Sequence, residues 1–263
     1  FDMYATLYRH EEPLPPRADV RHERLRIGFL AQHFLSSSSS LFYEGLLRGL
    51  TEQYDVYAYS LSDRTDGFTE CLRGAVNYHA VANLSIEEQA ERIRADEIDV
   101  LVDLGGHTDG GMTLMVLARR PAPVQLSGIG YFATTGLPTV DYMIGDVWLD
   151  GAPAGIKEAT FFTEKLLVLE HTHLCYTPAA DAPPAGTAPC MEKGFVTFGS
   201  FNAFAKASDE VLAVWAQILA AVPNSRLLLK SAAFSSEEGR TAALERLRTA
   251  GFDLEHVELR PDT

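Results

Sequence analysis

Cysteine and positive charge are both scarce in this chain. Its 263 residues include three cysteines, Cys71, Cys175 and Cys190, which lie too far apart to form a metal-ligand motif. We therefore expect free thiols in a reducing compartment. Lysine and arginine together number 22 against 36 aspartates and glutamates, a formal net charge of -14. This balance argues against a general binder of nucleic acid or anionic membranes, although one nucleotide could still occupy a locally positive pocket.

Long apolar runs are also missing, so the sequence predicts no membrane-spanning helix. The opening residues, "FDMYATLYRHEEPLPPRADVRHE", have no initiator methionine, basic segment or apolar segment of a signal peptide. The chain ends in "VELRPDT", directly after a strand-like run. We expect both ends to be cuts in a longer protein. The hydrophobic fraction of 46% and the charged fraction of 22% are typical of a folded globular chain.

Strand-like and helix-like segments alternate along the sequence. This alternation predicts an α/β fold built from βαβ units around mostly parallel sheets. One expected helix opens with a capping box of Ser85 and Glu88. The expected strands are 25–31, 54–61, 98–106, 124–131, 195–201, 225–232 and 256–260, and the expected helices are 41–53, 85–97, 112–120, 208–222 and 235–251.

The pattern divides into two halves, so we predict a cleft between them. Residues 1–24 form an N-terminal tail, 25–176 a first Rossmann-like lobe, 177–193 a linker rich in proline and alanine, and 194–263 the first part of a second lobe. In the helix at 208–222 we expect one apolar stripe, which we interpret as core packing. It consists of Val211, Leu212, Trp215, Ile218, Leu219 and Val222.

Polar and glycine-rich segments follow several strands, where open α/β sheets bind their ligands. Lys206 lies between a strand and a helix, in a loop with few other charges, which favours anion binding over a solvated surface lysine. The loop "DLGGHTDGG" (103–111) by itself reads more readily as a tight connection than as a binding loop. For "GIGYFATTGLP" (128–138), sugar or nucleotide binding and an ordinary strand end are equally good interpretations.

Histidines give weaker signals. His33 precedes the serine run "HFLSSSSSLF", and it could be an acid/base group or a structural histidine. We expect one of the serines to cap the helix that follows. The "HTH" of His171 and His173 alternates as in a strand, which would point both rings the same way, but we discount a metal site there.

Four segments together resemble the catalytic region of the O-GlcNAc transferase/SPINDLY family in its bacterial form. They are "LVDLGGHTDGG", "RRPAPVQLSGIGYFATTGLPTVDYMIGD", "FTEKLLVLEHTHLCYTP" and "VTFGSFNAFAKASDEVLAVWAQILAAVPNSRLLLK". The resemblance begins near residue 25, and the block "RPAPVQ…GY…TTGLP…DY" is its most specific part. It implies the GT-B type of α/β fold, with two Rossmann-like lobes and parallel sheets. Here the second lobe would be incomplete.

The resemblance also implies a function. Family members are cytoplasmic glycosyltransferases, usually behind tetratricopeptide repeats, to which residues 1–24 would be the join. They transfer a sugar, typically GlcNAc from UDP-GlcNAc, to Ser/Thr hydroxyls of proteins, and they invert the anomeric centre without a metal. The implied partners are therefore a nucleotide-sugar donor and an acceptor protein, with no cofactor, nucleic acid or membrane.

Site residues follow from the resemblance by position. Lys206 matches the lysine that contacts the donor diphosphate, where a cation offsets the charge that develops on the departing UDP. Asn202 lies in the same phosphate-side loop. The segment against the donor sugar corresponds to Ile129, Gly130 and Tyr131, and a loop that lines the same cleft corresponds to Gly106, His107 and Thr108.

Three departures from the family pattern stand out. His33 and Ser37 replace an aspartate and a histidine, so His33 becomes the second candidate catalytic residue, and Ala203 replaces a Gln or Asn. The chain also ends before the family's Gly/Thr-rich loop, which holds most of the donor's nucleotide. We therefore expect little or no transferase activity from these residues alone, unless another chain supplies the rest. The alternative is a catalytically dead nucleotide-binding or protein-interaction module.

Overall fold

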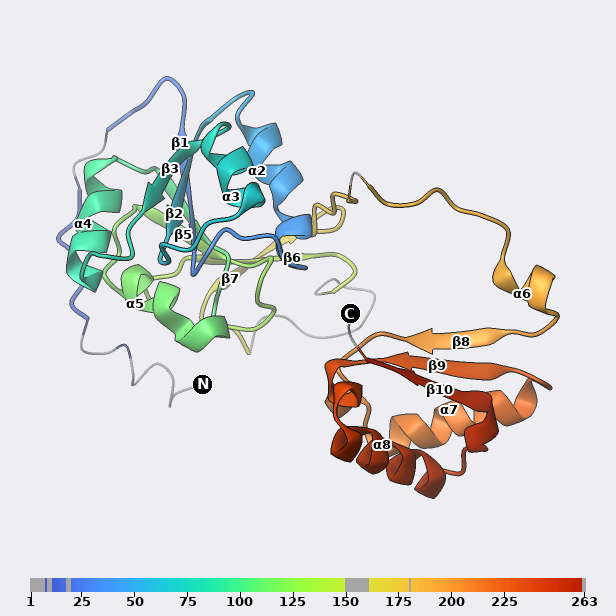
Figure 1. The fold of residues 1–263 in the computed structure, drawn as a ribbon. Helices are drawn as coiled ribbons and strands as arrows, with labels where there is room; N and C mark the ends of the chain where they lie inside the picture. The colour runs from blue at the N-terminus through green and yellow to red at the C-terminus, as the bar shows by residue number, and fades with distance from the viewer. Residues whose placement is uncertain (1–7, 9–10, 18–19, 150–160, 180, 262–263) are drawn as a thin grey trace. The chain divides into compact units, whose positions relative to one another are not determined.

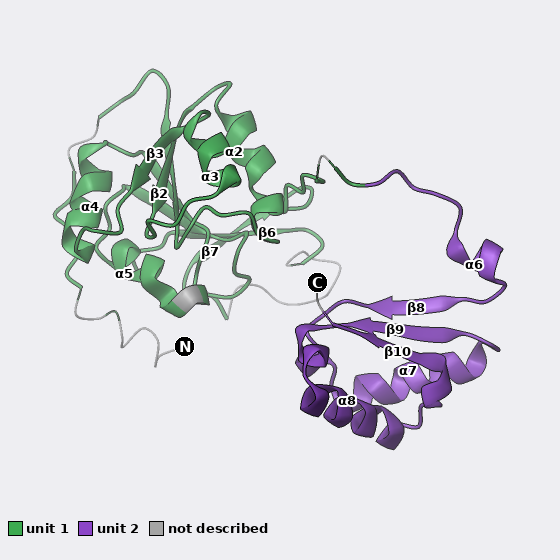
Figure 2. Ribbon diagram, viewed as in Figure 1, with its two compact units in different colours: residues 1–182 green, residues 183–263 purple. Residues whose placement is uncertain are grey.

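The computed structural model describes residues 8, 11–17, 20–149, 161–179 and 181–261 (Figure 1). It separates into two compact units, unit 1 with Phe1–Ala182 and unit 2 with Pro183–Thr263 (Figure 2). The division between the units lies in the segment predicted to be a linker. A short helix, α6 (Pro189–Lys193), occupies the end of that segment. Within the described residues, no helix combines the length and apolarity that a membrane span requires.

Unit 1 is built on a parallel sheet in the order β3-β2-β1-β4-β5-β6-β7. Helices follow β1, β2, β3 and β4, as expected for βαβ connections. The strands are β1 (Arg26–Ala31), β2 (Asp55–Ser60), β3 (Asn77–Ala80), β4 (Val100–Asp103), β5 (Val124–Ser127), β6 (Tyr142–Asp146) and β7 (Lys165–Leu169), and the helices are α2 (Glu44–Leu50), α3 (Gly67–Arg73), α4 (Ile86–Ala95) and α5 (Met112–Ala118).

Side chains from the two faces of this sheet enter two separate cores. In β1, Leu30 packs with residues of α4 and α5, whereas Phe29 and Ala31 pack with residues of α2 and α3 on the other face. A strand buried on both faces reads as a continuous apolar run, which is why "IGFLA" predicts it so clearly. The helices are fixed locally as well. Ser85 and Glu88 form the predicted capping box at the start of α4.

Unit 2 has a smaller parallel sheet in the order β10-β9-β8, with both long helices on the same side of it (Figure 1). This is the expected result of two successive crossovers of one hand. Its core contains side chains from β9, α7 and α8. The elements are β8 (Thr197–Ser200), α7 (Asp209–Ala221), β9 (Arg226–Lys230), α8 (Glu237–Thr249) and β10 (Val257–Arg260).

The apolar stripe of α7 is buried only in part. Leu212 is fully buried and Trp215 and Leu219 pack against the core, but Val211 and Ile218 are 39% and 38% exposed. The prediction that this stripe packs in the core is therefore confirmed for one side of it and wrong for Val211 and Ile218.

Several described residues of the segment predicted to be a tail contact the rest of unit 1. Tyr8 is buried in the core on the α4 and α5 face. The backbone N–H of Leu14 donates to the carbonyl of Arg119. His22 lies between the carboxylates of Asp99 and Glu97, at 2.9 and 3.2 Å. These contacts join the described part of the segment to the body of unit 1.

Candidate functional site

A buried carboxylate organises the loops that follow β4 and β5. Asp103, the last residue of β4, accepts hydrogen bonds from the backbone N–H groups of Gly105 and Gly106, both at 2.9 Å. Its second oxygen also accepts the hydroxyl of Ser127, at the end of β5, at 2.7 Å. Because β4 and β5 are adjacent and parallel, this one side chain holds the starts of both loops together.

The glycines of these loops allow the loops to touch each other. Gly106 has a φ of +55°, and a Cβ placed on it would lie 2.4 Å from the Cβ of Tyr131. A Cβ on Gly130 would lie 1.8 Å from the carbonyl oxygen of Leu104. Both distances are far inside van der Waals contact, so only glycine fits at these two positions. In the structure, these glycines therefore allow the loop after β4 and the loop after β5 to pack closely against each other.

Rings and a hydrogen bond complete this contact. The rings of His107 and Tyr131 meet edge to face, with their centroids 5.2 Å apart. His107 Nε2 donates to the carbonyl oxygen of Thr135 at 3.0 Å, which fixes the tautomer of the ring. Thr108 donates its hydroxyl to the carbonyl of Gly105. The side chain of Ile129 is buried in the core on the α2 and α3 face, so this residue can offer a ligand little more than its backbone.

A cavity of about 310 Å³ lies at the carboxyl ends of β1, β4 and β5. Three predicted site residues line it, namely His33, Thr108 and Gly130. His33 Nδ1 is buried and has no hydrogen-bond partner in the part of the chain that the structure describes. Tyr43 also lines the cavity. Burial, with a smaller contribution from Asp66, raises the pKa of Tyr43, so its hydroxyl stays neutral.

The serine run next to this cavity folds back on itself. The N–H of Ser37 donates to Ser40 Oγ at 3.0 Å, and the N–H of Ser40 donates to Ser37 Oγ at 3.2 Å. In the described chain, α2 begins after Tyr43 and has no side-chain cap. The expectation that a serine caps this helix was wrong, because these two serines satisfy each other one turn earlier.

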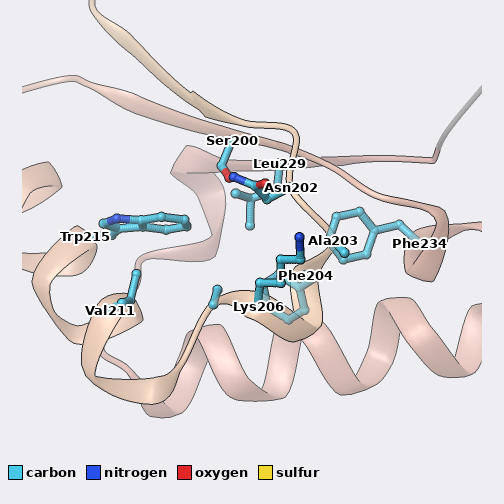
Figure 3. A pocket seen from close by; sticks show the side chains of 10 residues that line it. Ser200, Asn202, Ala203, Phe204, Lys206, Val211, Trp215, Leu229 and Phe234 are labelled. Atoms are coloured by element: carbon cyan, nitrogen blue, oxygen red, sulfur yellow. The ribbon is translucent and has the colours of Figure 1, made fainter. Parts of the chain in front are cut away.

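Unit 2 holds a separate pocket of about 80 Å³ around Lys206 (Figure 3). Lys206 ends a short turn, Phe204–Lys206, and its amino group points into the pocket. Asn202 lines the same pocket, so the structure brings together the two site residues predicted for this unit. The other lining residues are Ser200, Ala203, Phe204, Ala207, Val211, Trp215, Leu229 and Phe234.

Lys206 is the unneutralised charge of this pocket. Among the described residues it forms no ion pair, and the nearby Asp209 instead pairs with Arg246 at 2.6 Å. The helix end contributes less than expected. The side chain of Ser208 accepts the N–H of Val211, and the first turn of α7 carries two acidic residues. Any anion selectivity of this pocket therefore rests on the ammonium group more than on the dipole of α7.

Two further buried carboxylates with their partners were not predicted from the sequence. Glu164 is 4% exposed and accepts hydrogen bonds from Thr134 and Thr135. His173 Nδ1 lies 2.6 Å from a carboxylate oxygen of Asp146, and both side chains are buried. Hydrogen bonds from the backbone and ring of His173 lower the pKa of Asp146.

The two histidines of "HTH" lie differently from each other. His171 is exposed and His173 is buried, and both follow the end of β7. The strand ends at Leu169, before the motif begins, so the strand-like alternation of the two histidines, which we discounted, does not apply.

Comparison with known proteins decides the family. The sequence profile of glycosyl transferase family 41 matches residues 2–177. The chain belongs to this family. Its resemblance to the O-GlcNAc transferase/SPINDLY family is thereby confirmed, as is the α/β, GT-B type of fold with two Rossmann-like units.

One curated relative and two solved structures agree with this assignment to different degrees. A tomato (Solanum lycopersicum) protein named as a probable UDP-N-acetylglucosamine–peptide N-acetylglucosaminyltransferase SPINDLY is 39% identical over 92% of this chain and 26% of its own length. A mutant O-GlcNAc transferase from Thermobaculum terrenum superposes with a TM-score of 0.87 and 31% identity, over the whole of this chain and 50% of that one. An Anabaena protein solved with UDP and glucose shares only the fold, with 11% identity over 90% of this chain and 69% of its own and a TM-score of 0.51. The chain thus spans about a quarter of its tomato relative.

Proposed function

We propose that this chain takes part in the transfer of GlcNAc from UDP-GlcNAc to Ser/Thr hydroxyls of an acceptor protein. The names of its family 41 relatives support this donor and acceptor. The observation that carries the proposal is Lys206, an ammonium group without an ion pair among the described residues, in a pocket that also contains Asn202. Such a group suits the paired negative charges of a nucleoside diphosphate.

The reaction would be a single displacement. The acceptor oxygen attacks the anomeric carbon, the bond from that carbon to the diphosphate oxygen breaks, and UDP leaves with the electron pair. One displacement inverts the anomeric centre. Lys206 offsets the charge that develops on UDP, so no divalent metal is needed for that task. His33 lines the larger cavity of unit 1, and its buried Nδ1 has no hydrogen-bond partner among the described residues; it is our proposed acceptor of the hydroxyl proton.

The setting of this activity is also part of the proposal. We propose a cytoplasmic enzyme with tetratricopeptide repeats ahead of this region. We further propose that these 263 residues alone transfer little or no sugar. Experiments on function should therefore use the polypeptide of the complete reading frame, with this chain in parallel.

Calorimetric titration with UDP tests the role of Lys206. A hydrogen bond to a charged group contributes about 1.5–3 kcal/mol, so Lys206→Ala should weaken UDP binding roughly tenfold to a hundredfold. Lys193→Ala, at an exposed lysine of α6 in the same unit, is the matched control and should bind UDP normally. Uridine should bind both variants equally. Unchanged UDP affinity in Lys206→Ala would refute the assignment.

Transfer of radiolabelled GlcNAc to an acceptor peptide tests the role of His33. Loss of a general base typically slows a reaction by about 10²–10⁴-fold, so His33→Asn should lower kcat by that order and leave UDP affinity unchanged. A protein that binds UDP but never transfers sugar would instead support the alternative, a nucleotide-binding module without catalysis.

A further inference from the structure

Glu164 is a buried carboxylate without a cationic partner. Its side chain is 4% exposed, and within the described residues it forms no ion pair. Burying a charge is costly unless hydrogen bonds compensate it. Among the described residues, the compensating hydrogen bonds come from one neighbouring loop, the segment that follows β5.

Two threonines of that loop meet the two oxygens of Glu164. Thr134 Oγ1 donates to one oxygen at 2.8 Å. The backbone N–H of Thr135 donates to the other oxygen at 2.8 Å, and the Thr135 hydroxyl donates to the same oxygen. Both threonines are buried, at 2% and 0% exposure. A displacement of the loop would break all three bonds, so the carboxylate selects one position of the loop.

The same threonines fix the rest of the loop in turn. The N–H groups of Gly136 and Thr163 both donate to Thr134 Oγ1 at 3.1 Å. The N–H of Leu137 donates to Thr135 Oγ1 at 3.1 Å. The carboxylate is therefore the final acceptor of a connected network that includes Thr163, just ahead of β7.

The network extends to the first loop through the backbone of a single residue, Thr135. The N–H of Thr135 is held by Glu164, and the carbonyl of Thr135 accepts the hydrogen bond from His107 Nε2 at 3.0 Å. His107 packs edge to face on Tyr131. The position of Glu164, just ahead of β7, therefore sets the orientation of an imidazole that follows β4.

We propose that Glu164 is a positioning residue of the candidate site: it holds the loop after β5 and, through Thr135, the ring and tautomer of His107. Glu164 does not line the cavity of unit 1, so its action passes through the residues it holds. The expected effect of Glu164 on catalysis rests on the proposed function. The expected effect of Glu164 on the His107 ring does not depend on it.

NMR of the His107 imidazole tests the positioning directly. In the wild-type chain, the ¹⁵N shifts should report hydrogen on Nε2. Glu164→Gln keeps the size of the side chain but puts an amide where the threonines need an acceptor, so the His107 shifts should move and broaden. Glu170→Gln, at an exposed glutamate just past β7, is the matched control and should leave them unchanged. Thr135→Ser, which keeps both donors, should behave as the wild type.

Activity in the full polypeptide separates the two proposals. Glu164→Gln should lower kcat at least tenfold, with unchanged UDP affinity, because Lys206 lies in the other unit. If the wild type is inactive, the proposed function fails, but the His107 readout still decides the role of Glu164. If Glu164→Gln only lowers Tm, and leaves both the His107 signals and kcat unchanged below that temperature, the role is merely structural and the proposal is overturned.

Discussion

The glycines after β4 and β5 show how one residue type can serve two purposes. From the sequence, they would permit positive φ angles and the approach of a ligand to the backbone. In the structure, the missing Cβ of Gly130 leaves room for the carbonyl of Leu104, and the missing Cβ of Gly106 leaves room for Tyr131. A spacing of glycines cannot distinguish these uses, because both need the same absent atom. The partner becomes visible only when the two loops are seen together.

Gly130→Ala tests this interpretation at a single atom. Its Cβ would collide with a backbone oxygen that cannot rotate away, so we expect a loss of at least about 2–3 kcal/mol in the free energy of unfolding. Gly49→Ala is the control, because its Cβ meets nothing within 4 Å in α2, and alanine there should stabilise by up to about 1 kcal/mol. Urea unfolding of unit 1 measures both. Equal midpoints for the two variants would mean that the loops are not packed as described.

The buried carboxylates were the site residues hardest to predict from the sequence. Asp103 lies at a strand end, one residue ahead of the Gly105-Gly106 pair, a pattern that could have indicated a carboxylate accepting the loop's N–H groups. Glu164 gave no such signal, since its partners lie about thirty residues earlier in the chain. Local patterns reveal a hydrogen-bond acceptor only when its donors are close in sequence.

At the scale of elements, the helices and strands with the clearest apolar patterns were predicted correctly from the sequence. The strands β1, β2, β4 and β5, and the three of unit 2, all lie within expected ranges, and so do α2, α4, α5, α7 and α8. In unit 1, β1, β2 and β4 carry apolar residues on both faces of the sheet, so their runs stand out from their surroundings. The capping box of Ser85 predicted the first residue of α4 correctly, because all hydrogen bonds of the box are between residues close in sequence.

The elements that sequence reasoning missed have weaker local signals. Helix α3 has only two buried side chains. Its N-terminus is capped by Asp66, whose side chain accepts the N–H of Thr69 and also the N–H of Ser36 from an earlier loop. β3 at one edge of the sheet and β7 at the other carry several exposed residues. These edge strands owe their place to pairing with a neighbour already in the sheet, and no local pattern records that pairing.

At the scale of the molecule, the family profile and the compact units end at nearly the same place. The match to family 41 ends at residue 177, and unit 1 ends at Ala182. Each unit has its own apolar core, and the core of unit 2 contains only its own residues. Roughly 80 residues are enough for an independently folding domain. We therefore expect the two units to keep their folds when the chain between them is cut.

Limited proteolysis tests this expectation. Residues 181–188 are exposed throughout and lie outside any helix or strand, so brief treatment with elastase, which cleaves after small residues, should cut there. Mass spectrometry locates the cut, and Ala185→Pro with Ala188→Pro should slow it. Hydrogen exchange then measures the protection of backbone amides in each fragment. The amides of β9 should stay as protected after the cut as before, because Leu227 and Leu229 are buried by α7 and α8 of the same unit. If their protection disappears with the cut, the core of unit 2 depends on unit 1 and the two do not fold independently.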